Sequence, residues 1–156
     1  MLSPQALVAI DAWVRLLGAH AAMTRAFNAE LQAARGVTVM DFEVLRRLGS
    51  APDGRMRRVD LAQAVGLTPS GITRLLDGLL AEDLVRKEHC PVDARVAYAA
   101  ITPEGRAALA QAAAVHLSAL VAIFEERFSP DELGVLVTLL GRLPGAAEAD
   151  SCGPAG

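Results

Sequence analysis

Four neighbouring residues, Ser70, Gly71, Thr73 and Arg74, carry the most distinctive surface chemistry in this sequence. They lie in LTPSGITRLLDGLL (67–80), whose leucines and isoleucine recur at helical spacing and predict one buried face. The opposite face is then small, hydroxylated and cationic. A helix that enters the major groove of DNA must be slim at its N-terminal end and must offer hydrogen bonds to base edges. The four residues meet both needs, although an ordinary amphipathic helix with a solvated face is the plain alternative.

This helix is predicted to be the second helix of a tight helix-turn-helix. Gly66 interrupts the apolar pattern, and glycine readily takes the left-handed conformation that such a turn needs. Ala62 is small enough for two helices to approach each other, and Ile72 would fill the gap between them. Thr68-Pro69 supplies a hydroxyl N-cap followed by proline at the first helical position. The second helix is therefore expected to begin at Pro69.

A β-hairpin is predicted after this helix. LVRKEH (84–89) and RVAYAAI (95–101) have the composition of strands, and CPVDA (90–94) between them has that of a loop. The order of helix, helix-turn-helix and hairpin predicts a mainly α (α+β) fold with a winged helix-turn-helix lobe at 37–102.

The remaining helices are predicted by one shared signal, a hydroxyl N-cap followed by proline or answered by an acidic residue three positions later. It occurs at Ser3-Pro4, at Thr38 with Asp41, at Thr102-Pro103, and at Ser129-Pro130 with Glu132. The first of these helices should end near Gly36, and the last two near Phe128 and Leu143.

Long apolar helices outside the lobe predict an oligomer. We expect one domain over 1–143, with dimerisation helices at 3–34 and 103–143 and a disordered tail at 144–156. Each of the long helices is more apolar than a small lobe could cover. Two copies could bury these surfaces against each other.

Composition narrows the class of protein. The 156 residues carry a net charge of −3, but residues 46–106 hold ten basic and eight acidic residues, so the centre is basic between acidic ends. The two cysteines, Cys90 and Cys152, lie in different contexts and predict no structural disulfide. No apolar run reaches the roughly 18–20 uninterrupted residues that a membrane span needs. The N-terminus also lacks the basic segment of a signal peptide. Both observations predict a cytoplasmic protein without a membrane partner.

The segments LTPSGITRLLDGLLAEDLV and VRKEHCPVDARVAYAAITPEG resemble the MarR family of bacterial transcriptional regulators, and VTVMDFEVLRRL upstream is similar to that family's second helix. The most specific match is in the hairpin, where Asp93, Arg95 and Ile101-Thr102 stand at the family's D-x-R…L-T spacing. The resemblance implies that Arg95 reads the minor groove and that Asp93 orients it. Two residues depart from the family pattern: Ala94 replaces a frequent basic residue, and Asp83 replaces a usual glycine.

By this resemblance the chain is expected to be a homodimer that binds a near-palindromic operator in double-stranded DNA and acts as a repressor. Basic residues near the predicted interface are candidates for phosphate contacts, with simple solvation as an equal alternative. These are Arg57, Arg58, Arg86 and Lys87.

The resemblance also implies release by a small-molecule effector at the junction of the dimerisation helices and the lobe. The candidates for such a pocket, suited to a small aromatic or anionic effector, are Trp13, Leu17, His20, Met23 and Met40. The plain alternative for His20 is a core or interface histidine.

Other functions find little support. We find no phosphate-binding glycine loop, nucleophile elbow or metal-ligand spacing, so no enzyme activity, metal or cofactor is expected. Cys90 lies near Lys87 and His89, which would favour a reactive thiolate, but an unreactive cysteine is the preferred interpretation. A winged-helix protein-interaction module without DNA binding is the alternative function, motivated by Ala94 and by the acidic net charge.

Overall fold

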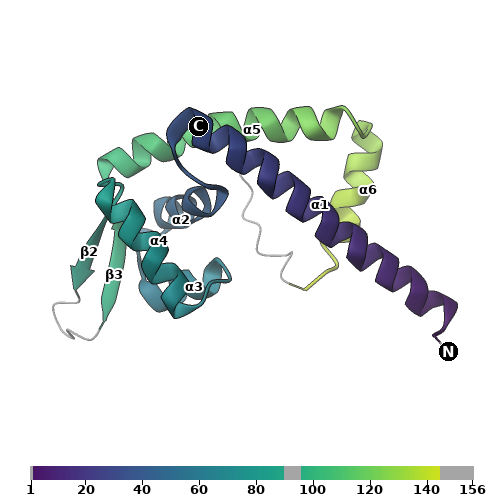
Figure 1. The fold of residues 1–156 in the computed structure, drawn as a ribbon, viewed down its shortest axis with the longest axis horizontal. Helices are drawn as coiled ribbons and strands as arrows, with labels where there is room; N and C mark the ends of the chain where they lie inside the picture. Colours follow the sequence, from purple (N-terminus) through teal and green to yellow (C-terminus); the bar gives the residue numbers. More distant parts are fainter. Residues whose placement is uncertain (1, 90–95, 145–156) are drawn as a thin grey trace. The chain divides into compact units, whose positions relative to one another are not determined.

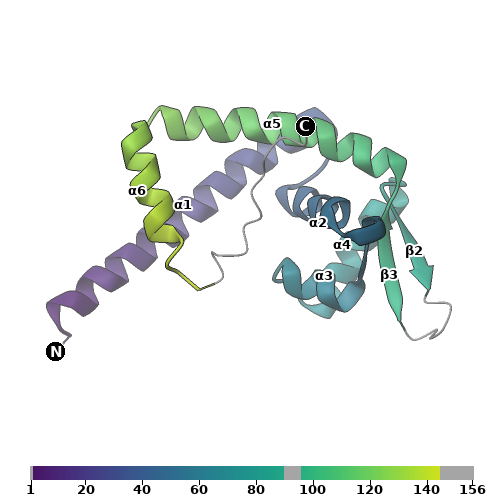
Figure 2. The same ribbon diagram turned by 180° about the vertical axis from the view of Figure 1, so that it is seen from behind.

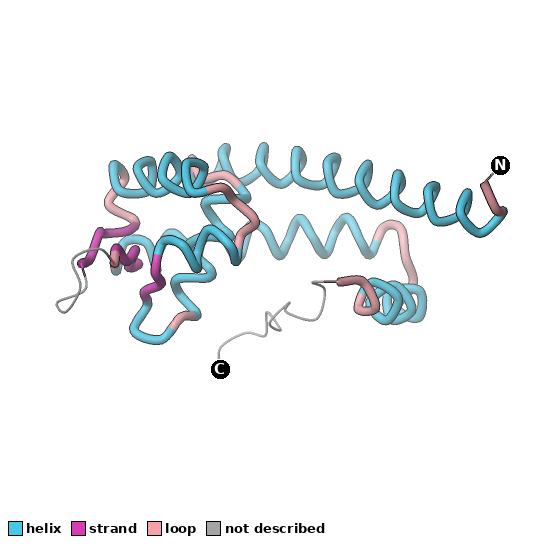
Figure 3. The backbone as a smooth tube through the Cα atoms, turned by 90° about the horizontal axis from the view of Figure 1, so that it is seen from below, coloured by secondary structure: helices cyan, strands magenta, loops and turns pink. Residues whose placement is uncertain are grey.

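The computed structural model describes residues 2–89 and 96–144, and the chain divides into two compact units, Met1–His116 and Leu117–Gly156. Figures 1 and 3 show that helices dominate and that the strands are short. In chain order the elements are α1 (Pro4–Arg35), α2 (Val39–Ser50), a 3₁₀ turn (Pro52–Gly54), β1 (Arg55–Arg57), α3 (Arg58–Ala64), α4 (Pro69–Ala81), β2 (Val85–His89), β3 (Ala97–Ile101), α5 (Pro103–Glu125) and α6 (Pro130–Leu140).

The predicted helix starts are confirmed. The Ser3 hydroxyl accepts the Ala6 N–H, and both Thr38 with Asp41 and Ser129 with Glu132 form reciprocal capping boxes. Gly36 ends α1 in the left-handed conformation, with φ of 70°. The helices α5 and α6 end about three residues earlier than predicted, because the chain there changes to turns with i→i−3 bonds such as Arg127 N–H to Phe124 O.

The sheet contains a strand that the sequence pattern did not predict. Its order is β1-β3-β2, with both neighbours antiparallel to β3, so Arg55 pairs with Ala100 and Arg57 with Tyr98. Strand β1 is only three residues long and directly precedes α3. It exists because β3, some forty residues further on, offers it a free edge, and local sequence carries no signal of that.

The main core lies among α2, α3, α4 and the sheet, which Figure 2 shows grouped together. Its fully buried side chains include Leu45, Leu48, Leu61 and Val44, none of which exposes measurable surface. A smaller cluster joins Leu31 of α1, Phe42 of α2 and Ala112 of α5. Aliphatic packing of this kind supplies most of the folding free energy.

A close contact joins the end of α4 to the start of α5. Asp83, which replaces the family's usual glycine, takes a left-handed φ of 57°, a conformation that aspartate tolerates better than most residues. The buried Thr102 hydroxyl donates to the Asp83 carbonyl at 2.7 Å and accepts the Gly105 N–H at 2.9 Å. The Ile101-Thr102 pair of the family pattern therefore has a structural role here.

Within residues 2–89 and 96–144, two helices, α1 and α5, are long and apolar enough to cross a membrane by length and composition alone. The predicted tail falls outside the described residues from position 145 onward. The division into a lobe and dimerisation helices stays a prediction.

Gly105→Ala should destabilise the fold by about 1–3 kcal/mol or more, because a methyl group there would overlap the Leu84 carbonyl oxygen. Gly78→Ala is the matched control, since nothing lies within 4 Å of a methyl group at that helical position. It should raise stability by up to about 1 kcal/mol. Urea denaturation measures both, and equal midpoints for the two variants would contradict the packing described.

Candidate nucleic-acid interface

The turn between α3 and α4 is built as the sequence predicted. Gly66 has φ of 69°, and a side chain there would meet no neighbour, so backbone conformation alone favours glycine. The Thr68 hydroxyl accepts the Gly71 N–H at 3.1 Å and Pro69 is the first helical residue. Ala62 and Ile72, exposed by 5% and 2%, belong to the core that joins the two helices.

The four predicted residues on the outer face of α4 differ in solvent exposure and in hydrogen bonding. Ser70 and Arg74 are exposed, whereas Gly71 and Thr73 are half-buried. Arg74 makes no hydrogen bond or ion pair with any residue in 2–89 or 96–144. Ser70 shares a 3.2 Å hydrogen bond with Thr68. The start of α4 therefore presents an exposed guanidinium and an exposed hydroxyl on a slim surface.

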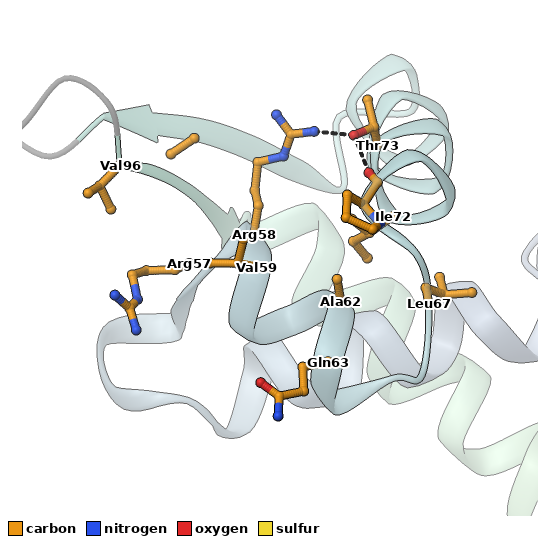
Figure 4. Close-up of a pocket in the computed structure, with 11 residues that line it drawn as sticks. Arg57, Arg58, Val59, Ala62, Gln63, Leu67, Ile72, Thr73 and Val96 are labelled. Atoms are coloured by element: carbon orange, nitrogen blue, oxygen red, sulfur yellow. Dashed lines mark hydrogen bonds between the residues drawn. The ribbon is translucent and has the colours of Figure 1, made fainter.

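The hydroxyl of Thr73 is already used within the protein. It donates its hydrogen to the Pro69 carbonyl at 2.7 Å and accepts a hydrogen bond from Nη2 of Arg58 (Figure 4). A hydroxyl has one hydrogen to donate, so in this arrangement Thr73 has none for a base edge. A contact with a base edge could then use only the remaining lone pair of its oxygen or its methyl group, and that role stays a prediction.

Three of the four predicted phosphate contacts are paired with carboxylates. Arg57 forms a two-point contact with Asp60 at 2.6 and 3.1 Å. Arg86 and Lys87 point to opposite faces of β2, as successive strand residues must, and reach Glu88 at 2.8 Å and Asp77 at 3.3 Å. These pairs are exposed and individually weak, so phosphate can displace the carboxylates.

A fifth basic residue near this surface was missed by sequence reasoning. Arg55 lies 5.3 Å from the centre of the Tyr98 ring and pairs with Glu88 at 3.2 Å. Hydrogen bonds from Arg86 and then from Arg55 hold the pKa of Glu88 below its usual value. Recognising Arg55 would have required strand β1, which brings it beside the hairpin.

A cavity of about 530 Å³ opens among these elements. It is lined by residues from the whole of α3 and the residue before it, from the turn that follows, from the first turns of α4 and from the start of β3 (Figure 4): Arg57, Arg58, Val59, Ala62, Gln63, Leu67, Pro69, Ile72, Thr73, Val96 and Ala97. Arg58 makes no ion pair with the described residues. The two predicted residues of the hairpin tip, Asp93 and Arg95, lie outside the described residues.

The five residues predicted for an effector pocket lie on α1 and at the start of α2. Trp13, Leu17 and Met40 are exposed by 59%, 48% and 37%, His20 is exposed, and Met23 is half-buried. None of them lines the cavity described above. Their grouping as a pocket stays a prediction.

A different histidine is packed inside the first unit. His116 of α5 lies 4.6 Å from the Phe27 ring and 5.1 Å from the Phe42 ring, measured between centroids. Its Nδ1 is buried with no hydrogen-bond partner among the described residues. His116 follows Ala112 by four positions and so shares its buried face, which the uniformly apolar sequence of α5 does not reveal.

A helix-turn-helix whose second helix has a free polar N-terminal face, followed by a β-hairpin, defines a winged helix-turn-helix protein. The sequence profile of the MarR family matches residues 35–96. The chain belongs to the MarR family of transcriptional regulators, and not to a class of enzymes.

Individual relatives are similar over much of the chain. The HTH-type transcriptional repressor YetL of Bacillus subtilis (strain 168) is 35% identical over 111 residues, which span 71% of this chain and 66% of that one. The structure of AbsC, a MarR family transcriptional regulator from Streptomyces coelicolor, has a TM-score of 0.76 at 27% identity and covers 90% of this chain and 92% of its own. Sco3205 from Streptomyces coelicolor, a MarR family regulator solved in complex with DNA, shares the fold with a TM-score of 0.77 at 24% identity, over 89% of this chain and 85% of that one.

His116 should make stability depend on pH. Burial lowers the pKa of His116, and the weaker attraction of Glu30 and Glu43 only partly opposes this. The unfolded chain then binds this proton more readily, so stability should fall as pH drops below about 6.5, the ordinary pKa of histidine. His116→Phe keeps an aromatic ring beside Phe27 and Phe42 but cannot titrate. Thermal melts from pH 7.5 to 5 should show a smaller loss for this variant, and parallel curves would contradict the assignment.

Proposed function

We propose that this regulator is a homodimeric, sequence-specific DNA-binding repressor that a small-molecule effector releases from its operator. The observation that carries the proposal is the free polar face at the start of α4, held outward by a buried apolar face. The repressor YetL and the DNA complex of Sco3205 support it, as does the solved complex of a mutant MarR from E. coli with operator DNA.

In this proposal the start of α4 lies in the major groove. Ser70 and Arg74 offer hydrogen bonds to base edges, and Gly71 lets the helix approach closely. The N–H groups and the positive end of the helix dipole favour a nearby phosphate. Arg95, from the segment of the chain between β2 and β3, enters the minor groove, where a narrow groove concentrates negative potential, and Asp93 restricts its rotamers.

The exposed apolar surface of the outer helices supports a homodimer. Large apolar side chains on α1 are exposed over several turns, among them Leu7, Val8, Ile10, Trp13, Val14 and Leu17. No residue of the helix α6 is buried, and its exposed large apolar side chains are Val135, Val137, Leu139 and Leu140. Surfaces of this extent mark an interaction site. A two-fold dimer would set two α4 helices about 34–36 Å apart, which fits successive major grooves of a near-palindromic site.

An effector would act through α1 and the start of α2. Trp13, Leu17, His20, Met23 and Met40 are the residues that we assign to it, and a second copy would enclose them further. A small aromatic or anionic molecule suits an indole beside an imidazole. It can release DNA only by binding the DNA-free form more tightly than the bound form.

Binding to DNA from the region upstream of the chain's own gene tests the proposal. A gel shift at low salt should show a complex that persists in excess unrelated DNA, and that weakens steeply as salt rises. Absent binding at low salt, or binding indifferent to sequence, would favour the alternative of a protein-interaction module.

Arg95→Ala should weaken binding on the order of tenfold and flatten the preference for A·T-rich flanks, because the minor-groove contact is lost. Arg142→Ala removes the same charge from the end of α6 and serves as the control. Fluorescence anisotropy on duplexes with A·T-rich and G·C-rich flanks measures both effects. Unchanged affinity in Arg95→Ala would remove the hairpin from the mechanism.

Leu17→Glu should convert the dimer to monomers, because it places a charge in the apolar surface that two copies would bury. Arg15→Gln changes the net charge by the same amount on the same helix, but the Arg15 side chain is 78% exposed and pairs with Asp11 of that helix. Sedimentation velocity at micromolar concentration distinguishes the species. A wild-type monomer, or a Leu17→Glu variant that stays dimeric, would refute this interface.

A further inference from the structure

We infer that Thr73 is a positioning residue for Arg58, and that Arg58 grips a DNA phosphate in the cavity between α4 and the hairpin. The inference rests on the proposed DNA-binding function, keeps the predicted phosphate contact of Arg58, and assigns to Thr73 a positioning role that the sequence pattern does not reveal. It begins from one hydrogen-bonded chain, in which Arg58 Nη2 donates to the Thr73 hydroxyl and that hydroxyl donates to the Pro69 carbonyl (Figure 4).

Thr73 is held in one orientation by this chain. Its bond to the carbonyl four residues earlier fixes the rotamer of a β-branched side chain that is already stiff. With its only hydrogen used, the oxygen can serve only as an acceptor. An acceptor repels phosphate oxygens but attracts a guanidinium, so the hydroxyl suits the support of Arg58 better than contact with DNA.

The bond to Thr73 leaves most N–H donors of the Arg58 guanidinium, and its positive charge, available for a phosphate. It is the first residue of α3, and its side chain reaches across to α4. A guanidinium has five N–H donors, of which the bond to Thr73 uses one. Arg57, Arg86 and Lys87 each have a carboxylate partner, whereas Arg58 has none in the described ranges. A phosphate can therefore bind Arg58 without first displacing a described acid.

The cavity places this guanidinium where a DNA strand must pass. Its walls come from α3, the turn that follows α3, the first turns of α4 and the start of β3. When α4 lies in the major groove and the hairpin approaches the adjacent minor groove, the sugar–phosphate strand that separates the two grooves runs between them. Val59, Val96 and Ala97 give that passage apolar walls suited to a sugar, and Arg58 supplies the charge for its phosphate.

Four proteins measured on two duplexes test the inference: the wild type, Arg58→Ala, Thr73→Val and the double variant. One duplex of about 30 base pairs is selected by the wild type from a randomised library, and the other carries the same bases scrambled. Arg58→Ala should weaken binding to both by a similar factor, about tenfold, and lower the salt exponent by about one. Thr73→Val should also weaken binding to both duplexes and lower the salt exponent. The double variant should bind no more weakly than Arg58→Ala.

Two further variants separate positioning from structure. Thr73→Ser keeps the hydroxyl and should bind like the wild type. Thr138→Val removes a hydroxyl with the same bond to the carbonyl four residues earlier, to Gly134 at 2.9 Å in α6, and should leave DNA binding unchanged. If Thr73→Ser instead lost affinity as Thr73→Val does, the retained hydroxyl would not be enough to preserve binding, and the inference would fail.

The other possible results distinguish failure of this inference from failure of the proposed function. A change in the ratio of the two affinities in Thr73→Val, with an unchanged salt exponent, would show that Thr73 reads bases and would overturn the inference. Additive losses in the double variant would show that Thr73 does not act through Arg58. Failure of the wild type to bind either duplex would instead overturn the proposed function, and this inference with it.

Discussion

Gly66 and Thr68 together decide where α4 begins, and every feature of the interface depends on that start. Gly66 turns the chain with φ of 69°, and the Thr68 hydroxyl caps the helix at Gly71. Ile72 then falls on the buried face and Arg74 on the outer one. A start shifted by one residue would rotate the helix by about 100°, which would expose Ile72 and bury charge. The left-handed turn at Gly66 and the Thr68 cap thus determine which side chains of α4 face outward.

A chain with a negative net charge can still present a DNA-binding surface, because carboxylate side chains there pair with the arginines and the lysine and hold them in place. Arg57, Arg86 and Lys87 each meet a carboxylate at the surface, and Arg58 meets a neutral hydroxyl instead. Exposed ion pairs contribute little to folding, so their carboxylates restrict the long side chains without binding them tightly. The net charge of −3 therefore says less about function than the arrangement of charge on a few elements.

Local signals predicted most of this fold, and distant contacts account for what was missed. The caps at Ser3, Thr38 and Ser129 act within four residues, so the sequence alone reveals them. Strand β1 and the bond between Arg58 and Thr73 join residues that only the folded chain brings together. For the same reason sequence could propose Thr73 as a surface residue but could not show that its hydroxyl was already used. His116 was missed because α5 is apolar on nearly every side, so only the folded chain shows that its face beside Ala112 is buried.

Chemical protection of bound DNA tests the placement of α4 most directly. Dimethyl sulfate methylates guanine at N7, which faces the major groove, and adenine at N3, which faces the minor groove. On a duplex selected by the protein, the account predicts protected guanine N7 atoms in two patches one helical turn apart, about 10 base pairs. It also predicts protected adenine N3 atoms in the minor grooves where the hairpins enter, and loss of that second set in Arg95→Ala. A bound duplex whose guanine N7 atoms all stay reactive would contradict it.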